Sequence, residues 1–192
     1  MTPEKVDRSA FKVARGLRYR TWTQTDARGH CLVRASDANE AASRLEVTLV
    51  RYGLARADLA DRVRCVAGDL AQPSFGLSAD EFERLARSLD TIVHSGAAVN
   101  FVFPYESLRP SNVGGTREVL RLASAGAARL HHVSTIGVFP GGRGALSTVH
   151  EDARPGTPDA LALGYMRAKW VAEALVESGA DRGLPTAIYR PA

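Results

Sequence analysis

Short apolar segments alternate with longer segments of helical periodicity from His30 to the end of the chain, and this order constrains the fold most strongly. Repeated strand and helix segments of this kind are typical of βαβ units built around a parallel sheet. We therefore predict an α/β fold with a doubly wound parallel sheet. The expected strands cover residues 30–34, 62–66, 91–94, 130–135 and 186–190. The expected helices cover residues 37–52, 78–89, 112–126 and 165–178.

Helix-start signals support this division of the chain. Asp37 with Glu40, and Ser78 with Glu81, have the spacing of capping boxes, in which each side chain bonds a backbone N–H of the first turn. Asn112 is expected to cap the third helix, and Gly126 is expected to end it.

Composition narrows the class of protein. The chain has 192 residues, 45% hydrophobic and 24% charged, which fits one globular domain and excludes a disordered chain. It has no apolar run long enough to cross a bilayer and no apolar signal region at its start, so we expect a cytoplasmic protein without membrane contact. The pI of 9.4 comes from scattered Arg residues, so no nucleic-acid partner is expected. Cys31 and Cys65 lack metal-ligand spacing, so we expect core cysteines and no metal.

Tyr165 and Lys169 lie four residues apart and are expected on one face of a helix. An ammonium close to a phenol favours the phenolate, and at this spacing it is expected to lower the phenol pKa from about 10 toward neutrality. A phenol with such a pKa can give a proton to a developing alkoxide. The same spacing is also compatible with an exposed Tyr and Lys that only face solvent.

Thr135 comes at the carboxyl end of an expected strand, where ligands collect in open α/β sheets. Its hydroxyl can donate to the carbonyl oxygen that Tyr165 would protonate, which would give an oxyanion site made from two side chains. The alternative is that Ser134 and Thr135 only cap or fill the core.

A predicted dinucleotide site follows from residues at the ends of other strands. Arg34 stands where an acid selects NADH and an arginine receives the 2′-phosphate of NADPH, so we predict NADPH. Arg44 can add a second guanidinium, although a solvated helix Arg is the simpler interpretation. Asp69 is placed to meet the adenine amino group, and Leu70 beside it is included in the site. Small residues leave room for the cofactor to approach at Gly96, Ala97 and Ala98.

Several motifs in these segments resemble one family. The chain is similar to the extended short-chain dehydrogenase/reductases, and among them to the thioester reductase domains of nonribosomal peptide synthetases and carboxylic acid reductases. The resemblance covers residues 25–192, and its most specific part is the block from His94 to Ala123. The motifs are CLVRA at 31–35, AGDL at 67–70, HSGAAVNFVFPYESLR at 94–109, NVGGTREVLRLA at 112–123, VSTIGVF at 133–139, GYMRAKWVAE at 164–173 and YRPA at 189–192.

The resemblance implies a Rossmann-like reductase that uses NADPH to reduce an acyl thioester on the phosphopantetheine arm of a carrier protein. The product would be an aldehyde or, after a second reduction, an alcohol. Thr135, Tyr165 and Lys169 would form the catalytic trio, Lys169 would also hold the nicotinamide ribose, and Arg34 would hold the 2′-phosphate.

The family pattern is incomplete at both ends. Residues 1–29 hold only Gly16 and Gly29 and lack the glycine-rich turn TGATGFLG, so we expect the first, central strand to be missing, with at most Phe11–Val13 as a partial substitute. The C-terminal substrate portion is also expected to be missing after Ala192. We divide the chain into an atypical segment, residues 1–29, and a partial NADP-binding domain, residues 30–192. Such a fragment is expected to carry the catalytic trio and to bind NADPH weakly.

Two other functions remain open at this point. One is a different extended short-chain enzyme, such as a sugar-nucleotide epimerase or a fatty acyl reductase. The other is a non-catalytic remnant that retains the motifs.

Overall fold

The computed structural model describes residues 9–12, 27–55, 61–141 and 148–191. These residues form one parallel sheet of six strands in the order β3-β2-β1-β4-β5-β6. The strands in chain order are β1 (Ser9–Lys12), β2 (Arg28–Val33), β3 (Val63–Ala67), β4 (Thr91–His94), β5 (Arg129–Val133) and β6 (Thr186–Tyr189). This order reverses direction at β1, which is the topology of a doubly wound dinucleotide-binding sheet. The predicted α/β, Rossmann-like fold class is confirmed.

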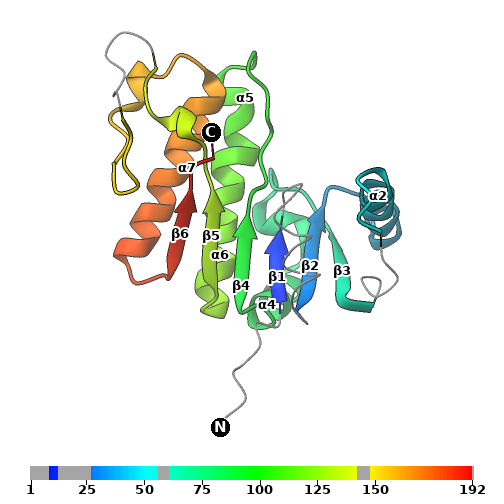
Figure 1. The fold of residues 1–192 in the computed structure, drawn as a ribbon. Coiled ribbons are helices and arrows are strands. Elements are labelled where there is room, and N and C mark those ends of the chain that lie inside the picture. The colour runs from blue at the N-terminus through cyan, green and yellow to red at the C-terminus, as the bar shows by residue number, and fades with distance from the viewer. Residues whose placement is uncertain (1–8, 13–26, 56–60, 142–147, 192) are drawn as a thin grey trace.

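Helices connect the parallel strands. They are α2 (Ala38–Arg51), α4 (Ala79–Arg87), α5 (Tyr105–Arg109), α6 (Gly115–Gly126) and α7 (Gly164–Asp181). Short helical turns accompany them, namely η1 (Pro73–Gly76), the π-helical η2 (Pro110–Gly114), η3 (Ile136–Val138) and η4 (Pro158–Ala160). Figure 1 shows α4, α6 and α7 along one face of the sheet, with α2 beside β2 and β3.

The core lies between the sheet and α4, α6 and α7. Amphipathic spacing buries Phe82, Leu85 and Ala86 of α4, as the sequence predicts. These residues pack in one cluster with Ile92 of β4 and Leu130 of β5. The main core is therefore built on the face that carries α7, which fixes that helix against β5.

The prediction that the central strand is missing is wrong. Ser9–Lys12 forms β1 and pairs in parallel with both β2 and β4, with Phe11 opposite His30 and Ile92. The segment is short and lacks an apolar run, so its sequence gives little strand signal. Two flanking strands nevertheless satisfy its backbone N–H and C=O groups, which is a tertiary effect that overrides local propensity. The absent glycine-rich turn concerns residues 13–26, which lie outside the described residues.

Two helix caps differ from their predictions. Asp37 caps α2 by accepting from the backbone N–H of Asn39 and Glu40, but Glu40 accepts from Ser36 and so does not complete a box with Asp37. Asn112 is not a cap, because the chain is already helical from α5 through η2 into α6. The predicted box of Ser78 and Glu81 is confirmed.

Candidate functional site

The carboxyl ends of β4 and β5 and the first turns of α7 come together at one edge of the sheet. Thr135 lies two residues beyond the end of β5 and caps η3, with its Oγ1 accepting from the N–H of Gly137 at 3.2 Å. The backbone N–H groups on either side of Thr135, of Ser134 and Ile136, donate to carbonyls at the end of β6, at Tyr189 and Pro191. The position of the Thr135 hydroxyl is therefore set by the sheet.

The α7 helix presents Tyr165 and Lys169 toward this edge. The ammonium of Lys169 is buried, with 3% of the residue exposed, and donates to the carbonyl oxygen of Val133 at 2.6 Å. Tyr165 is half-buried, and its ring meets the Phe101 ring edge-on at 5.4 Å. Lys169 therefore ties α7 to the end of β5, two residues before Thr135.

Electrostatics at this edge differ from the prediction. Burial raises the pKa of the Tyr165 phenol, so the predicted lowering of that pKa by Lys169 is wrong in this structure. Burial also lowers the pKa of Lys169 to about 8, and the nearby Glu173 carboxylate opposes this shift. The physical reason is that sequence spacing fixes which side chains share a helix face, whereas desolvation depends on the packing around them.

Glu173 is a residue that the sequence interpretation missed. It is buried one turn beyond Lys169, and its Oε1 accepts from Nε and Nη2 of Arg190 at 2.9 and 2.5 Å. Its place four residues after Lys169 is the signal that was available in the sequence. The ion pair joins α7 to the end of β6.

A cavity of about 440 Å³ lies at the carboxyl ends of β2 and β3 and brings together Arg34, Arg44 and Asp69. Nη1 of Arg44 donates to the Arg34 carbonyl at 2.7 Å, so Arg44 is directed toward the β2 end and is not simply solvated. Asp69 Oδ1 accepts from the N–H of Ala71 at 2.8 Å, which fixes the orientation of this carboxylate at the cavity wall. Leu70 does not line this cavity and packs against the core.

Gly96, Ala97 and Ala98 follow β4, beside the central strand. Asn112 holds this segment with two hydrogen bonds, because its Oδ1 accepts from the Ala98 N–H at 2.7 Å and its Nδ2 donates to the Ala98 carbonyl at 3.1 Å. The predicted small-residue exit is thus fixed by a buried amide on η2. Sequence spacing alone indicated a cap at Asn112, since the same residue type serves both purposes.

No group of three or more metal-ligating side chains occurs within the described ranges. Among those same residues, no helix has the length and apolar character that crossing a lipid bilayer requires.

Six parallel strands in this order, guanidinium groups at the β2 end and a Tyr and Lys pair beside β5 define the class of nicotinamide-dependent short-chain reductases. Comparison with known proteins agrees with this class. The NAD-binding family described as male sterility protein matches residues 21–192. The chain belongs to this family, and by descent it is an NAD(P)-dependent oxidoreductase domain.

The relatives confirm the predicted resemblance to terminal reductase domains. A linear gramicidin synthase of Brevibacillus parabrevis is 48% identical over 168 residues, which is 86% of this chain and 3% of the synthase. The solved terminal R domain of the myxalamid PKS-NRPS pathway is 42% identical, with a TM-score of 0.92 over 99% of this chain and 50% of that domain. The reductase domain of a nonribosomal peptide synthetase from Mycobacterium tuberculosis is 33% identical, with a TM-score of 0.74 over 97% and 47%. The chain therefore spans about half the length of these solved domains.

Proposed function

We propose that the chain binds NADPH and reduces an acyl thioester, held on the phosphopantetheine arm of a carrier domain, to an aldehyde or alcohol in the cytoplasm. The observation that carries this proposal is the bond between Lys169 and the Val133 carbonyl, which fixes the helix bearing Tyr165 against the strand end bearing Thr135. The relatives are reductase domains of peptide synthetases, which supports a carrier-bound substrate.

The residues present fit NADPH at the cavity beside β2. Arg34 and Arg44 offer two guanidinium groups, which suit a 2′-phosphate better than a ribose hydroxyl. Gly68 has no room for a side chain, because a Cβ there would lie 2.5 Å from the Phe75 carbonyl oxygen. Arg34 and Arg44 would hold the 2′-phosphate, Asp69 would meet the adenine, and the backbone at Gly96, Ala97 and Ala98 would adjoin the ribose. When bound, the nicotinamide supplies a hydride to the thioester carbonyl carbon.

The protein side of the reaction concerns the carbonyl oxygen. The Thr135 hydroxyl already accepts from Gly137, so its proton is available to donate to that oxygen. Tyr165 would supply the proton that the oxygen gains as negative charge develops on it. Lys169 would hold the nicotinamide ribose and, while charged, favour proton loss from Tyr165. The carbon–sulfur bond then breaks, and the carrier thiol leaves with the aldehyde released.

The test is turnover of a carrier domain loaded with an acyl-phosphopantetheine, followed through NADPH consumption and trapped aldehyde. Tyr165→Phe should lower the rate at least about 100-fold, since general-acid catalysis contributes that much or more. Tyr52→Phe is the matched control, because that phenol follows the last residue of α2, outside the proposed site, and its loss should leave the rate unchanged. Turnover of a nucleotide sugar instead of the thioester would favour an epimerase-like enzyme.

A further inference from the structure

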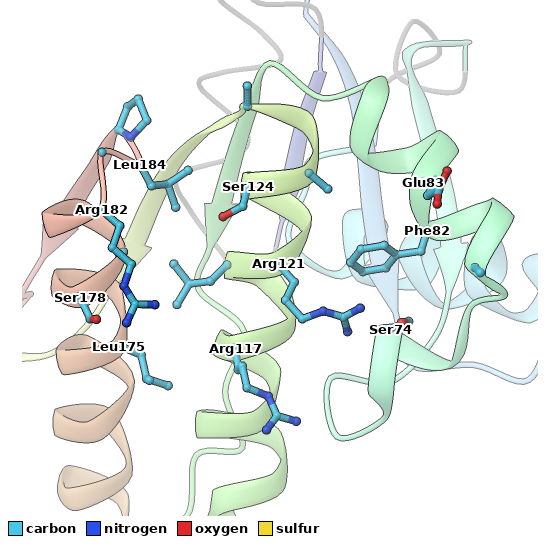
Figure 2. Close-up of a pocket in the computed structure, with 17 residues that line it drawn as sticks. Ser74, Phe82, Glu83, Arg117, Arg121, Ser124, Leu175, Ser178, Arg182 and Leu184 are labelled. Atoms are coloured by element: carbon cyan, nitrogen blue, oxygen red, sulfur yellow. The ribbon is translucent and has the colours of Figure 1, made fainter.

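The turn η1 lies between the cofactor cavity and a second hollow. Phe75 and Gly76 line the cavity that holds Arg34. Ser74, next to them, lines a groove of about 1060 Å³ between α4, α6 and α7. Figure 2 shows this groove, with Arg117 and Arg121 projecting from α6 and Arg121 directed toward Phe82 and Ser74. One turn of backbone therefore has a surface in both hollows.

The backbone of η1 is strained. Ser74 has φ 49° and ψ 25°, and Phe75 has φ 62° and ψ 16°, so two consecutive non-glycine residues occupy the left-handed region. Side chains disfavour this region because Cβ approaches the following carbonyl, and such strain persists only where surrounding contacts fix the conformation. The contacts that hold the turn are therefore informative.

Phe75 connects the turn to the proposed adenine-binding residue. Its ring is fully buried and packs against Phe82 at a centroid distance of 5.9 Å. Its carbonyl oxygen accepts from the N–H of Asp69 at 2.9 Å. A shift of Phe75 would therefore move the backbone of Asp69, which lines the same cavity.

Glu118 holds the other residue of the turn. Only 3% of Glu118 is exposed, and its Oε2 accepts from the backbone N–H of Ser74 at 3.0 Å across 44 residues of sequence. The carboxylate also pairs with Arg121 and, at 3.5 Å, with Arg117. These two guanidinium groups compensate the charge of the buried carboxylate, which would otherwise be costly. A hydrogen bond to a charged acceptor is among the stronger ones, so Glu118 is suited to stabilise a strained turn.

We infer that Glu118 is a positioning residue for the adenosine end of the cofactor site. It acts through a continuous path, from its carboxylate to the N–H of Ser74, from the Phe75 carbonyl to the N–H of Asp69, and so to the cavity. The inference rests on the proposed function in one respect, namely that this cavity takes the adenosine part of NADPH.

The test uses adenosine 2′,5′-bisphosphate, which carries the adenosine half of NADPH, and measures its Kd by titration calorimetry with the full chain. Glu118→Ala should raise that Kd about tenfold, the effect of losing one hydrogen bond to a charged group. Glu118→Gln should bind almost as the wild type does, because its amide oxygen can still accept from Ser74. Hydrogen exchange at the Asp69 and Phe75 amides should accelerate in Glu118→Ala and not in Glu118→Gln.

Val176→Ala is the control for a general loss of stability. Val176 is fully buried on α7, away from η1, so this variant should lower Tm without changing the Kd or the exchange at Asp69. Equal binding and equal exchange in Glu118→Ala and wild type would overturn the inference, as would an equal weakening in Val176→Ala. If the wild type binds no nucleotide, the proposed cofactor fails, and the exchange rates still decide whether Glu118 holds the turn.

Discussion

At the scale of single residues, Lys169 is the group whose charge depends most on the fold. Burial lowers its pKa from 10.5 to about 8, so the folded protein binds this proton less tightly than the unfolded chain does. Between pH 8 and 10.5 the unfolded state therefore holds more protons, and the free energy of unfolding rises with pH in this window.

We predict that Lys169→Met removes this rise. The wild type should gain about 3 kcal/mol at most between pH 8 and 10.5 relative to the variant, because one pKa unit corresponds to about 1.4 kcal/mol. Urea unfolding of both proteins across this range measures the difference, and other groups that titrate there cancel between them. Parallel pH profiles would show that Lys169 keeps an ordinary pKa in the folded protein.

A second prediction at this scale concerns Glu173, whose carboxylate raises the pKa of Lys169 against the effect of burial. Glu173→Gln keeps an oxygen that can accept from Arg190 but removes the negative charge. The pKa of Lys169 should then fall further below 8, and the alkaline limb of the pH–rate profile should move to lower pH, since the reaction as proposed uses charged Lys169. Glu177→Gln, one turn further along α7, is the control and should leave the limb in place.

Residue identity and spacing predicted part of this site. The Tyr165 and Lys169 pair could be placed on one helix face from its spacing, and Thr135 could be placed at a strand end. The pKa directions could not be predicted, because they depend on how deeply α7 packs against β5. Glu173 and Arg190 are far apart in sequence, and only the fold brings them into contact.

At the scale of elements, the turn from β3 into η1 shapes the proposed adenosine site. Gly68 follows β3, and a Cβ at this position would lie 2.5 Å from the Phe75 carbonyl oxygen and 3.0 Å from Leu32 Cδ1. The turn therefore closes tightly over β3 only because residue 68 has no side chain.

We predict that Gly68→Ala destabilises the protein by about 1 to 3 kcal/mol, the usual cost of overpacking, and weakens adenosine 2′,5′-bisphosphate binding. Gly141→Ala is the matched control, because a Cβ there meets nothing within 4 Å and the backbone is not left-handed. Thermal unfolding and titration of both variants measure the two effects. Similar results for both variants would mean that the turn tolerates a Cβ at residue 68.

Helix ends were more predictable than turns. The Ser78 and Glu81 box is a local pattern whose partners lie three residues apart, so the sequence specifies it completely. The η1 turn has left-handed Ser74 and Phe75, residue types that give no such signal. Asn112 shows the same limit, because its amide bonds Ala98 across 14 residues and this contact is absent from any local pattern.

At the scale of the whole molecule, the sheet order was predictable wherever strands carry apolar runs, and it failed at β1. Ser9–Lys12 is placed by pairing with β2 and β4 on both sides, so its position comes from its neighbours and not from its own sequence. A central strand alone does not make a complete dinucleotide site, since the pyrophosphate usually contacts a glycine-rich turn and the helix N-terminus that follows the first strand.

This separation leads to a prediction about NADPH itself. The cavity with Arg34, Arg44 and Asp69 is present, whereas residues 1–29 contain only Gly16 and Gly29 and no glycine-rich turn. Most of the binding free energy should then come from the adenosine 2′-phosphate end, so NADPH should bind less than about tenfold more tightly than adenosine 2′,5′-bisphosphate, a difference of at most about 1.4 kcal/mol. Nicotinamide fluorescence for NADPH and calorimetry for the bisphosphate give the two Kd values. Arg34→Ala should weaken both ligands by the same factor, because both carry the 2′-phosphate, and Arg28→Ala, at the opposite end of β2, should weaken neither. A low-micromolar Kd for NADPH beside a much weaker bisphosphate would show that another part of the chain holds the pyrophosphate.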